Sequence, residues 1–129
     1  KGNMIRLHYN EEAHVIGSEV SDTMKALLEK VISEGTGKKC FIEGYRIGGK
    51  TATSQKLPRG SGKYIASFIG FAPADNPEII GIVLIDEPTG AYYGGTVAAP
   101  VMREIFENVL PYYLGQWPDI ESDSGDGNE

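Results

Sequence analysis

The chain has 129 residues, a mass of 14.0 kDa, 40% hydrophobic and 9% aromatic residues, and a formal net charge of −6. This length suits one domain with a single hydrophobic core, and the composition is that of a globular protein. Five acidic residues after position 118 carry most of the net charge, so residues 1–118 are nearly neutral. We therefore expect a folded domain over 1–118 and an acidic disordered tail over 119–129, with no nucleic-acid partner.

Several site classes are excluded by the cysteine, histidine and apolar patterns. The single cysteine, Cys40, cannot form an intrachain disulfide, and His8 and His14 lack metal-ligand spacing, so no metal or cofactor is predicted. The longest apolar stretch, residues 79–85, is too short to cross a bilayer. Since the chain begins with Lys1, we expect an excised piece whose targeting segments were left behind.

The first half of the chain predicts a strand followed by a helix. Residues 4–9 alternate apolar and polar, which is typical of a strand, and Ser18 or Ser21 offers a helix start. Apolar residues then recur at three- and four-residue steps over 21–34, which predicts an amphipathic helix with a core-facing stripe that ends at Gly35 and Gly37.

The second half predicts three strands and a final helix. The strands are expected over 41–54, 63–72 and 78–86, and their short connections imply an antiparallel meander. The last strand is apolar on both faces, which favours a central, doubly covered position. Gly94 opens the final helix, in which Pro100 is tolerable in the first turn and Pro111 is expected to end or kink it. The fold class is α+β: an antiparallel sheet of about three to five strands flanked by helices.

One nucleotide-binding pattern is present but lacks its structural context. Residues 44–51 satisfy G-x-x-x-x-G-K-[ST], and IVLIDE over 82–87 imitates an aspartate-bearing strand, so a P-loop nucleotide hydrolase is a remote alternative. A P-loop requires a helix directly after its lysine. The residues that follow Lys50 are TATSQKLPRGSG, which contain Pro58 and no apolar residues at helical spacing.

Five separated segments carry a family likeness. They are VISEGTGKK, GYRIGGKTATSQK, YIASFIGFAPADNPEI, IVLIDEP and YYGGTVAAPVMREI, in this order. Together they resemble the C-terminal part of the transpeptidase domain of class B penicillin-binding proteins, and in particular its sporulation-specific type. The resemblance implies a penicillin-binding, serine-transpeptidase-like fold. It also implies a peptidoglycan D,D-transpeptidase that cross-links stem peptides through an acyl-serine intermediate and is acylated by β-lactams.

The same resemblance assigns roles to the K-T-G-like strand. Lys50 would supply positive charge to the cleft, the hydroxyls of Thr51 and Thr53 would bind the substrate's terminal carboxylate, and the Thr53 backbone N–H would be an oxyanion donor. Ala52 replaces the usual glycine of this motif, and its methyl group is expected on the same strand face as Lys50, where it would alter substrate or β-lactam fit.

The nucleophile of the family is absent from the sequence. No serine is followed three residues later by lysine, and no S-x-N occurs, so the chain alone is expected to be inactive and to need the missing N-terminal part of its domain. The parent would be anchored in the membrane with this domain outside the cytoplasm, and the chain itself would be soluble. The open alternatives are a non-catalytic module that binds peptidoglycan or a partner, and a merely structural strand at residues 50–53. Uncovered apolar faces would favour an oligomer of the fragment.

Overall fold

The computed structural model describes residues 10 and 12–114. Helix α1 spans Ser18–Ser33, a short 3₁₀ turn η1 spans Lys38–Cys40, and strands β1, β2 and β3 span Gly48–Gln55, Tyr64–Ala72 and Ile79–Asp86. Helix α2 spans Gly94–Leu114. The predicted strand over 4–9 and the predicted tail over 119–129 lie outside the described residues. Neither described helix combines the length and the hydropathy needed to cross a bilayer.

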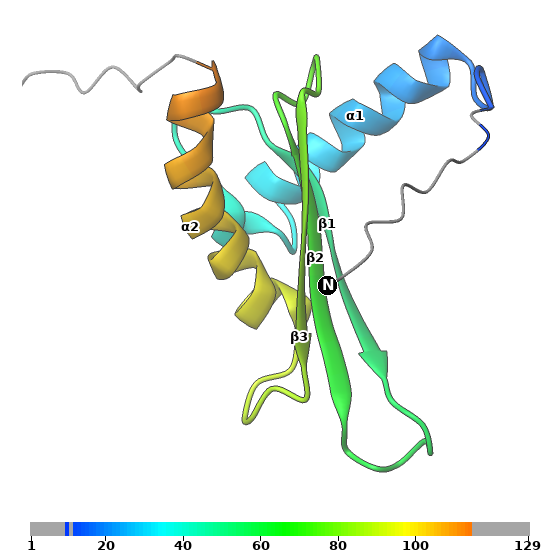
Figure 1. Cartoon of the computed structure of the whole chain (residues 1–129), viewed down its shortest axis with the longest axis vertical. Helices are drawn as coiled ribbons and strands as arrows, with labels where there is room; N and C mark the ends of the chain where they lie inside the picture. The colour runs from blue at the N-terminus through cyan, green and yellow to red at the C-terminus, as the bar shows by residue number, and fades with distance from the viewer. Residues whose placement is uncertain (1–9, 11, 115–129) are drawn as a thin grey trace, which may run out of the picture.

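The three strands form an antiparallel sheet in the order β1-β2-β3. Both registers are unbroken, from Gly48 opposite Phe71 to Gln55 opposite Tyr64, and from Ile65 opposite Asp86 to Ala72 opposite Ile79. Helix α2 lies along one face of this sheet, and α1 lies on the other side of it (Figure 1). The predicted α+β class and antiparallel meander are confirmed.

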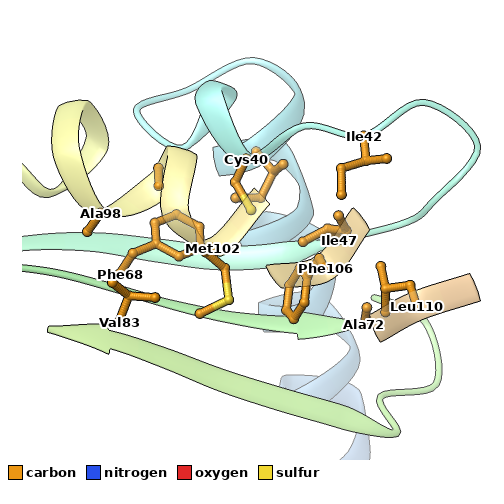
Figure 2. Close-up of a cluster of buried hydrophobic side chains, with 12 residues drawn as sticks. Cys40, Ile42, Ile47, Phe68, Ala72, Val83, Ala98, Met102, Phe106 and Leu110 are labelled. Atoms are coloured by element: carbon orange, nitrogen blue, oxygen red, sulfur yellow. The ribbon is translucent and has the colours of Figure 1, made fainter. Parts of the chain in front are cut away.

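The buried core lies between α2 and the sheet. Phe68 of β2 and Phe106 and Met102 of α2 are almost completely buried, and Figure 2 shows their side chains packed together. Cys40 of η1 and Leu110 of α2 belong to the same cluster. Burial of apolar side chains is the main source of stability for a small domain. The packing of α2 against the sheet therefore holds β1 in place.

Helix α1 was predicted in the right place, but its apolar stripe was assigned too widely to the core. Ile32 is buried, whereas Met24 and Leu27 are 45% and 53% exposed. The N-terminal half of the stripe therefore has little cover among the described residues, because α1 meets the sheet mainly near the start of β1 (Figure 1).

The first strand was predicted too long. It begins at Gly48 rather than near residue 41, because residues 38–40 form η1 and the Tyr45 N–H donates to the Ile42 carbonyl in a turn. The apolar residues Ile42 and Ile47, which suggested a strand, are buried as parts of a loop that packs against the core.

The predicted central position of the last strand was wrong. β3 is an edge strand and β2 is central. Val83 faces α2 and is 8% exposed, whereas Ile82 and Leu84 on the other face are 62% and 65% exposed. The apolar run of β3 reflects two apolar faces, of which the described chain covers one.

The predicted positions of the two prolines relative to the ends of α2 were also wrong. Pro100 is its seventh residue rather than part of its first turn, and Pro111 lies inside the helix, which continues to Leu114. Each proline removes one intrahelical N–H donor. The buried contacts of Ala98, Met102 and Leu110 on the same helix offset that loss.

Candidate active-site strand

Strand β1 presents the K-T-A-T residues alternately on its two faces. Lys50 and Ala52 pair opposite Ile69 and Ser67, and Thr51 and Thr53 pair opposite Phe68 and Ala66. Since Phe68 and Ala66 point toward α2, Thr51 and Thr53 lie on the α2 face, and Lys50 and Ala52 lie on the opposite one. The expectation that Ala52 shares a face with Lys50 is confirmed, and its methyl group is directed away from the α2 side.

The backbone of Thr51 and Thr53 points to the free edge of β1. The Lys56 N–H donates to the Lys63 carbonyl at 2.9 Å, which makes this a hydrogen-bonded pair of the antiparallel ladder. Alternation along the unbroken register then gives the same type of pair at Ser54, Ala52 and Lys50. The N–H and C=O groups of the residues between them are therefore directed away from β2, on an edge without a neighbouring strand in the described sheet.

The Lys50 ammonium folds back to this same edge. Its Nζ donates to the carbonyl oxygen of Thr51 at 2.9 Å, and the side chain is exposed. The cation thus lies beside the outward-pointing peptide groups and on the side opposite the threonine hydroxyls.

The two threonine hydroxyls are held by residues far away in the sequence. Thr51 Oγ1 lies 3.1 Å from Thr36 Oγ1, and the Gly94 N–H donates to Thr53 Oγ1 at 3.1 Å. Thr53 therefore caps the first turn of α2 from an adjacent strand. From the sequence, Gly94 was predicted only as the start of the final helix and Thr36 was given no role, although both belong to segments that carried the family resemblance.

Gly94 is required at this junction because the backbone of α2 comes directly against the sheet. A Cβ at Gly94 would collide with the carbonyl oxygens of Ser67 and Ala52. Ala52 and Ser67 are a cross-strand pair whose side chains point to the other face, so the bare backbone of the sheet receives the start of the helix. This close approach fixes the distance between α2 and β1.

A pocket of about 570 Å³ lies beside the threonine hydroxyls. It is lined by residues from the loop after α1, from η1, from β1, from the loop before α2 and from the start of α2: Gly35, Thr36, Lys38, Lys39, Thr51, Thr53, Tyr93, Gly94, Gly95 and Thr96. Thr51 and Thr53 are thus brought together with Lys38 and Lys39, for which the sequence predicted no role. Lys50 and Ala52 are not among the lining residues.

An aromatic stack holds the loop before α2. The rings of Tyr64 and Tyr92 are stacked with centroids 4.1 Å apart, and Tyr92 in turn contacts Tyr93. The Tyr93 carbonyl accepts the N–H groups of Thr96 and Val97, so this loop ends in the first turn of α2. A hydrogen bond to Tyr92 raises the pKa of the Tyr93 phenol, which keeps it neutral near pH 7.

An ion-pair cluster fixes the end of β1 beyond the threonines. Lys56 Nζ lies 2.9 Å from an Asp86 carboxylate oxygen and 2.8 Å from Glu87 Oε1, and Lys63 pairs with Glu87 as well. Hydrogen bonds from Lys56 and Lys63 lower the pKa of the Glu87 carboxyl, and the hydrogen bonds of Lys56 to Glu87 and Asp86 raise the pKa of Lys56. The charges tie the ends of all three strands together next to Thr53.

Cys40 is not a candidate nucleophile. The thiol is completely buried, and this burial raises its pKa to about 12, so it is protonated near neutral pH. In the part of the chain that the structure describes, no three His, Cys, Asp or Glu side chains are grouped to hold a metal ion.

The geometry contradicts the P-loop alternative. Lys50 is the third residue of β1, the strand continues to Gln55, and the next helix in the described chain begins only at Gly94. A phosphate-binding loop that passes into a helix is absent after this lysine.

Comparison with protein-family models matches residues 2–107 to the penicillin binding protein transpeptidase domain. The chain belongs to this family. Stage V sporulation protein D of Bacillus subtilis is 48% identical over 101 residues, and a peptidoglycan D,D-transpeptidase FtsI homolog of Chlorokybus atmophyticus is 40% identical over 106 residues. These alignments cover 75% and 78% of this chain but only 16% of each relative, so the chain spans about a sixth of their length.

Solved structures give the same family and the same fold. The transpeptidase domain of the FtsI4 D,D-transpeptidase from Legionella pneumophila is 35% identical with a TM-score of 0.66, over 74% of this chain and 37% of that one. The transpeptidase domain of Burkholderia pseudomallei penicillin-binding protein 3 is 40% identical with a TM-score of 0.62, over 74% of this chain and 30% of that one. The penicillin-binding, serine-transpeptidase-like fold is thereby confirmed.

Proposed function

We propose that this chain is the substrate-binding part of a peptidoglycan D,D-transpeptidase that cross-links stem peptides through an acyl-serine intermediate. The proposal rests above all on the free edge of β1, where the peptide groups of Thr51 and Thr53 point outward and the Lys50 ammonium lies alongside. Membership of the transpeptidase family supports the same conclusion.

The strand acts by pairing with an extended acyl donor. Main-chain hydrogen bonds to Thr51 and Thr53 would align the scissile D-alanyl carbonyl, and the Thr53 N–H would stabilise the oxyanion that forms when serine attacks. The Thr51 and Thr53 hydroxyls would bind the terminal carboxylate, and Lys50 would add positive charge near the reacting groups. Serine attack releases D-alanine, and an amine of a second stem peptide takes the acyl group.

The remaining features of the parent follow from this assignment. Residues 1–118 form the C-terminal portion of the transpeptidase domain, residues 119–129 form an acidic tail, and the nucleophilic serine comes from the missing N-terminal part of the same domain. The parent is anchored in the membrane with this domain outside the cytoplasm. Its ligands are stem peptides and β-lactams, and it acts in sporulation, in keeping with the name of the Bacillus subtilis relative.

The experiment is acylation of the complete protein by a fluorescent penicillin. Thr53→Pro removes the outward N–H, and it breaks no ladder bond because this N–H does not face β2. We expect acylation to fall about 100- to 1,000-fold, the usual cost of one oxyanion donor. Gln55→Pro changes another outward-facing N–H of β1 and is the matched control, whereas Thr53→Val keeps the N–H and removes only the hydroxyl.

The result separates the enzyme from its alternative. If the complete wild-type protein gains no penicillin, the transpeptidase assignment fails and a non-catalytic module that binds peptidoglycan or a partner is favoured. If Thr53→Pro and Gln55→Pro lose the same activity, the role of the Thr53 N–H is wrong.

A further inference from the structure

The pocket beside β1 has an unbalanced set of charges. Lys38 and Lys39 both line it, and none of its ten lining residues is acidic. Neither lysine forms an ion pair or a side-chain hydrogen bond with another described residue. Lys25, Lys56 and Lys63, by contrast, all pair with carboxylates. Among the described residues, the site thus holds two cations without a protein counter-ion, which favours an anionic ligand.

The turn that carries these lysines is fixed to the core. Cys40, directly after Lys39, is completely buried, and Ile42 is also buried. The Cys40 N–H donates to the Gly37 carbonyl at 2.8 Å, which closes the turn. The two ammonium groups therefore extend from a rigid base rather than from a loose loop.

Hydroxyl donors face the same pocket. Thr53 Oγ1 accepts a hydrogen bond from the Gly94 N–H, so its own hydrogen remains available to a ligand. Thr36 and Thr51 share one hydrogen bond between their hydroxyls, which leaves the second hydrogen of this pair available as well. O–H donors and cations are groups that bind a carboxylate through strong, charge-assisted hydrogen bonds.

Lys50 is badly placed to serve this carboxylate. Its ammonium donates to the Thr51 carbonyl, and its side chain belongs to the face of β1 opposite the hydroxyls. We propose that Lys38 and Lys39, rather than Lys50, supply the positive charge that selects the terminal carboxylate of the acyl donor, with Thr36 orienting the Thr51 hydroxyl. This inference rests on the proposed function and identifies two specificity-determining residues of its site.

The test uses the complete protein that carries this chain and two ligands that differ in one charge. Benzylpenicillin has a carboxylate, and benzylpenicillin methyl ester has none. We expect the double variant Lys38→Gln, Lys39→Gln to be acylated about tenfold more slowly than wild type by benzylpenicillin, the size of a lost charge-assisted hydrogen bond. Its rate with the methyl ester should match the wild-type rate.

Two further variants sharpen the result. Lys38→Arg with Lys39→Arg should retain most of the preference for the charged ligand, since it keeps both cations. Lys30→Gln removes a lysine of α1 that does not line the pocket, and it should leave both rates unchanged. Added salt should slow the reaction of wild type with benzylpenicillin more than that of the glutamine variant.

The outcomes distinguish this inference from the proposed function. Equal rates of wild type and the glutamine double variant with benzylpenicillin would overturn the inference alone, as would an equal loss with both ligands. If wild type is not acylated at all, the proposed function fails and the inference fails with it.

Discussion

The two faces of the sheet differ in how completely the described residues cover them. On the α2 face, Phe68 and Val83 are buried under Met102 and Phe106. On the opposite face, Ile82 and Leu84 of β3 stay largely exposed, although they are equally apolar. The comparison shows that the described residues bury one face of the sheet in a core, and that hydropathy alone does not tell which face is covered.

The candidate site is divided between these faces. The threonine hydroxyls belong to the α2 face, where Thr36 and Gly94 fix them, and Lys50 belongs to the open one. The threonine hydroxyls on the covered face are thus positioned by their packed neighbours. A substitution on that face should alter both the stability of the fold and the geometry of the site. Changes on the open face should affect the fold of this chain much less.

The largest expected effect is on the covered face. Phe106→Ala should lower the free energy of unfolding of the chain by about 3–5 kcal/mol, because the ring is almost fully buried and leaves a cavity. Ile82→Ala, on the open face, should cost less than about 1 kcal/mol. Urea denaturation measures both. Equal losses would contradict the claim that the described residues cover the α2 face of the sheet far more completely than the other.

The next effect is at the junction of α2 with β1. Gly94→Ala should destabilise the chain by about 1–3 kcal/mol, because the new methyl group collides with sheet carbonyls and displaces the helix start. Gly17→Ala is the matched control, since nothing lies within 4 Å of a Cβ there. A Gly94→Ala variant as stable as Gly17→Ala would show that α2 does not approach the sheet so closely.

A smaller effect is expected from the cap between strand and helix. Thr53→Val keeps the shape of the side chain but leaves the Gly94 N–H without its acceptor, which should cost about 1 kcal/mol. Thr89→Val removes an exposed hydroxyl from the loop before α2 and should cost nothing measurable. Hydrogen exchange at Gly94 should increase only in Thr53→Val.

The smallest effect concerns an ion pair between α1 and the approach to β1. Arg46 donates two hydrogen bonds to the Glu29 carboxylate, and these lower the carboxyl pKa from its ordinary value of 4.5. The pair therefore contributes stability that is present above about pH 4.5 and is lost as the pH falls through the lowered pKa.

Glu29→Gln should accordingly lower the free energy of unfolding slightly at pH 7. This free energy should then fall less steeply with decreasing pH than it does in wild type, as measured by urea denaturation at several pH values. Glu43→Gln, which removes an exposed acid with no ion pair among the described residues, should leave the acid profile unchanged. If both variants follow the wild-type profile, the Glu29–Arg46 pair does not contribute to the pH dependence.

The open face also predicts association of the isolated chain. Exposed apolar side chains on β3 and on α1 favour an oligomer or strand exchange, so light scattering should give a mass above 14.0 kDa. Leu84→Lys should lower that mass without affecting the covered core. A monomeric wild-type chain would contradict this expectation.

Local sequence patterns predicted the elements well and their environments less well. The period-two pattern of residues 50–53 correctly placed Lys50 and Ala52 on one face, and the glycines correctly limited α1 and α2. The position of β3 was wrong because an apolar run reports what can be buried and not which neighbours bury it. The hydrogen bond of Thr36 with Thr51 joins residues 15 positions apart, and that of Gly94 with Thr53 joins residues 41 apart, so no local pattern contains them.

The most direct test of the central claim is the mass of two proteins after incubation with penicillin. The claim is that this chain carries the substrate-binding strand of a transpeptidase and not its nucleophile. The complete protein should gain one equivalent of penicillin, and the isolated 129-residue chain should keep its mass of 14.0 kDa. A penicillin adduct on the isolated chain, or none on the complete protein, would contradict the account.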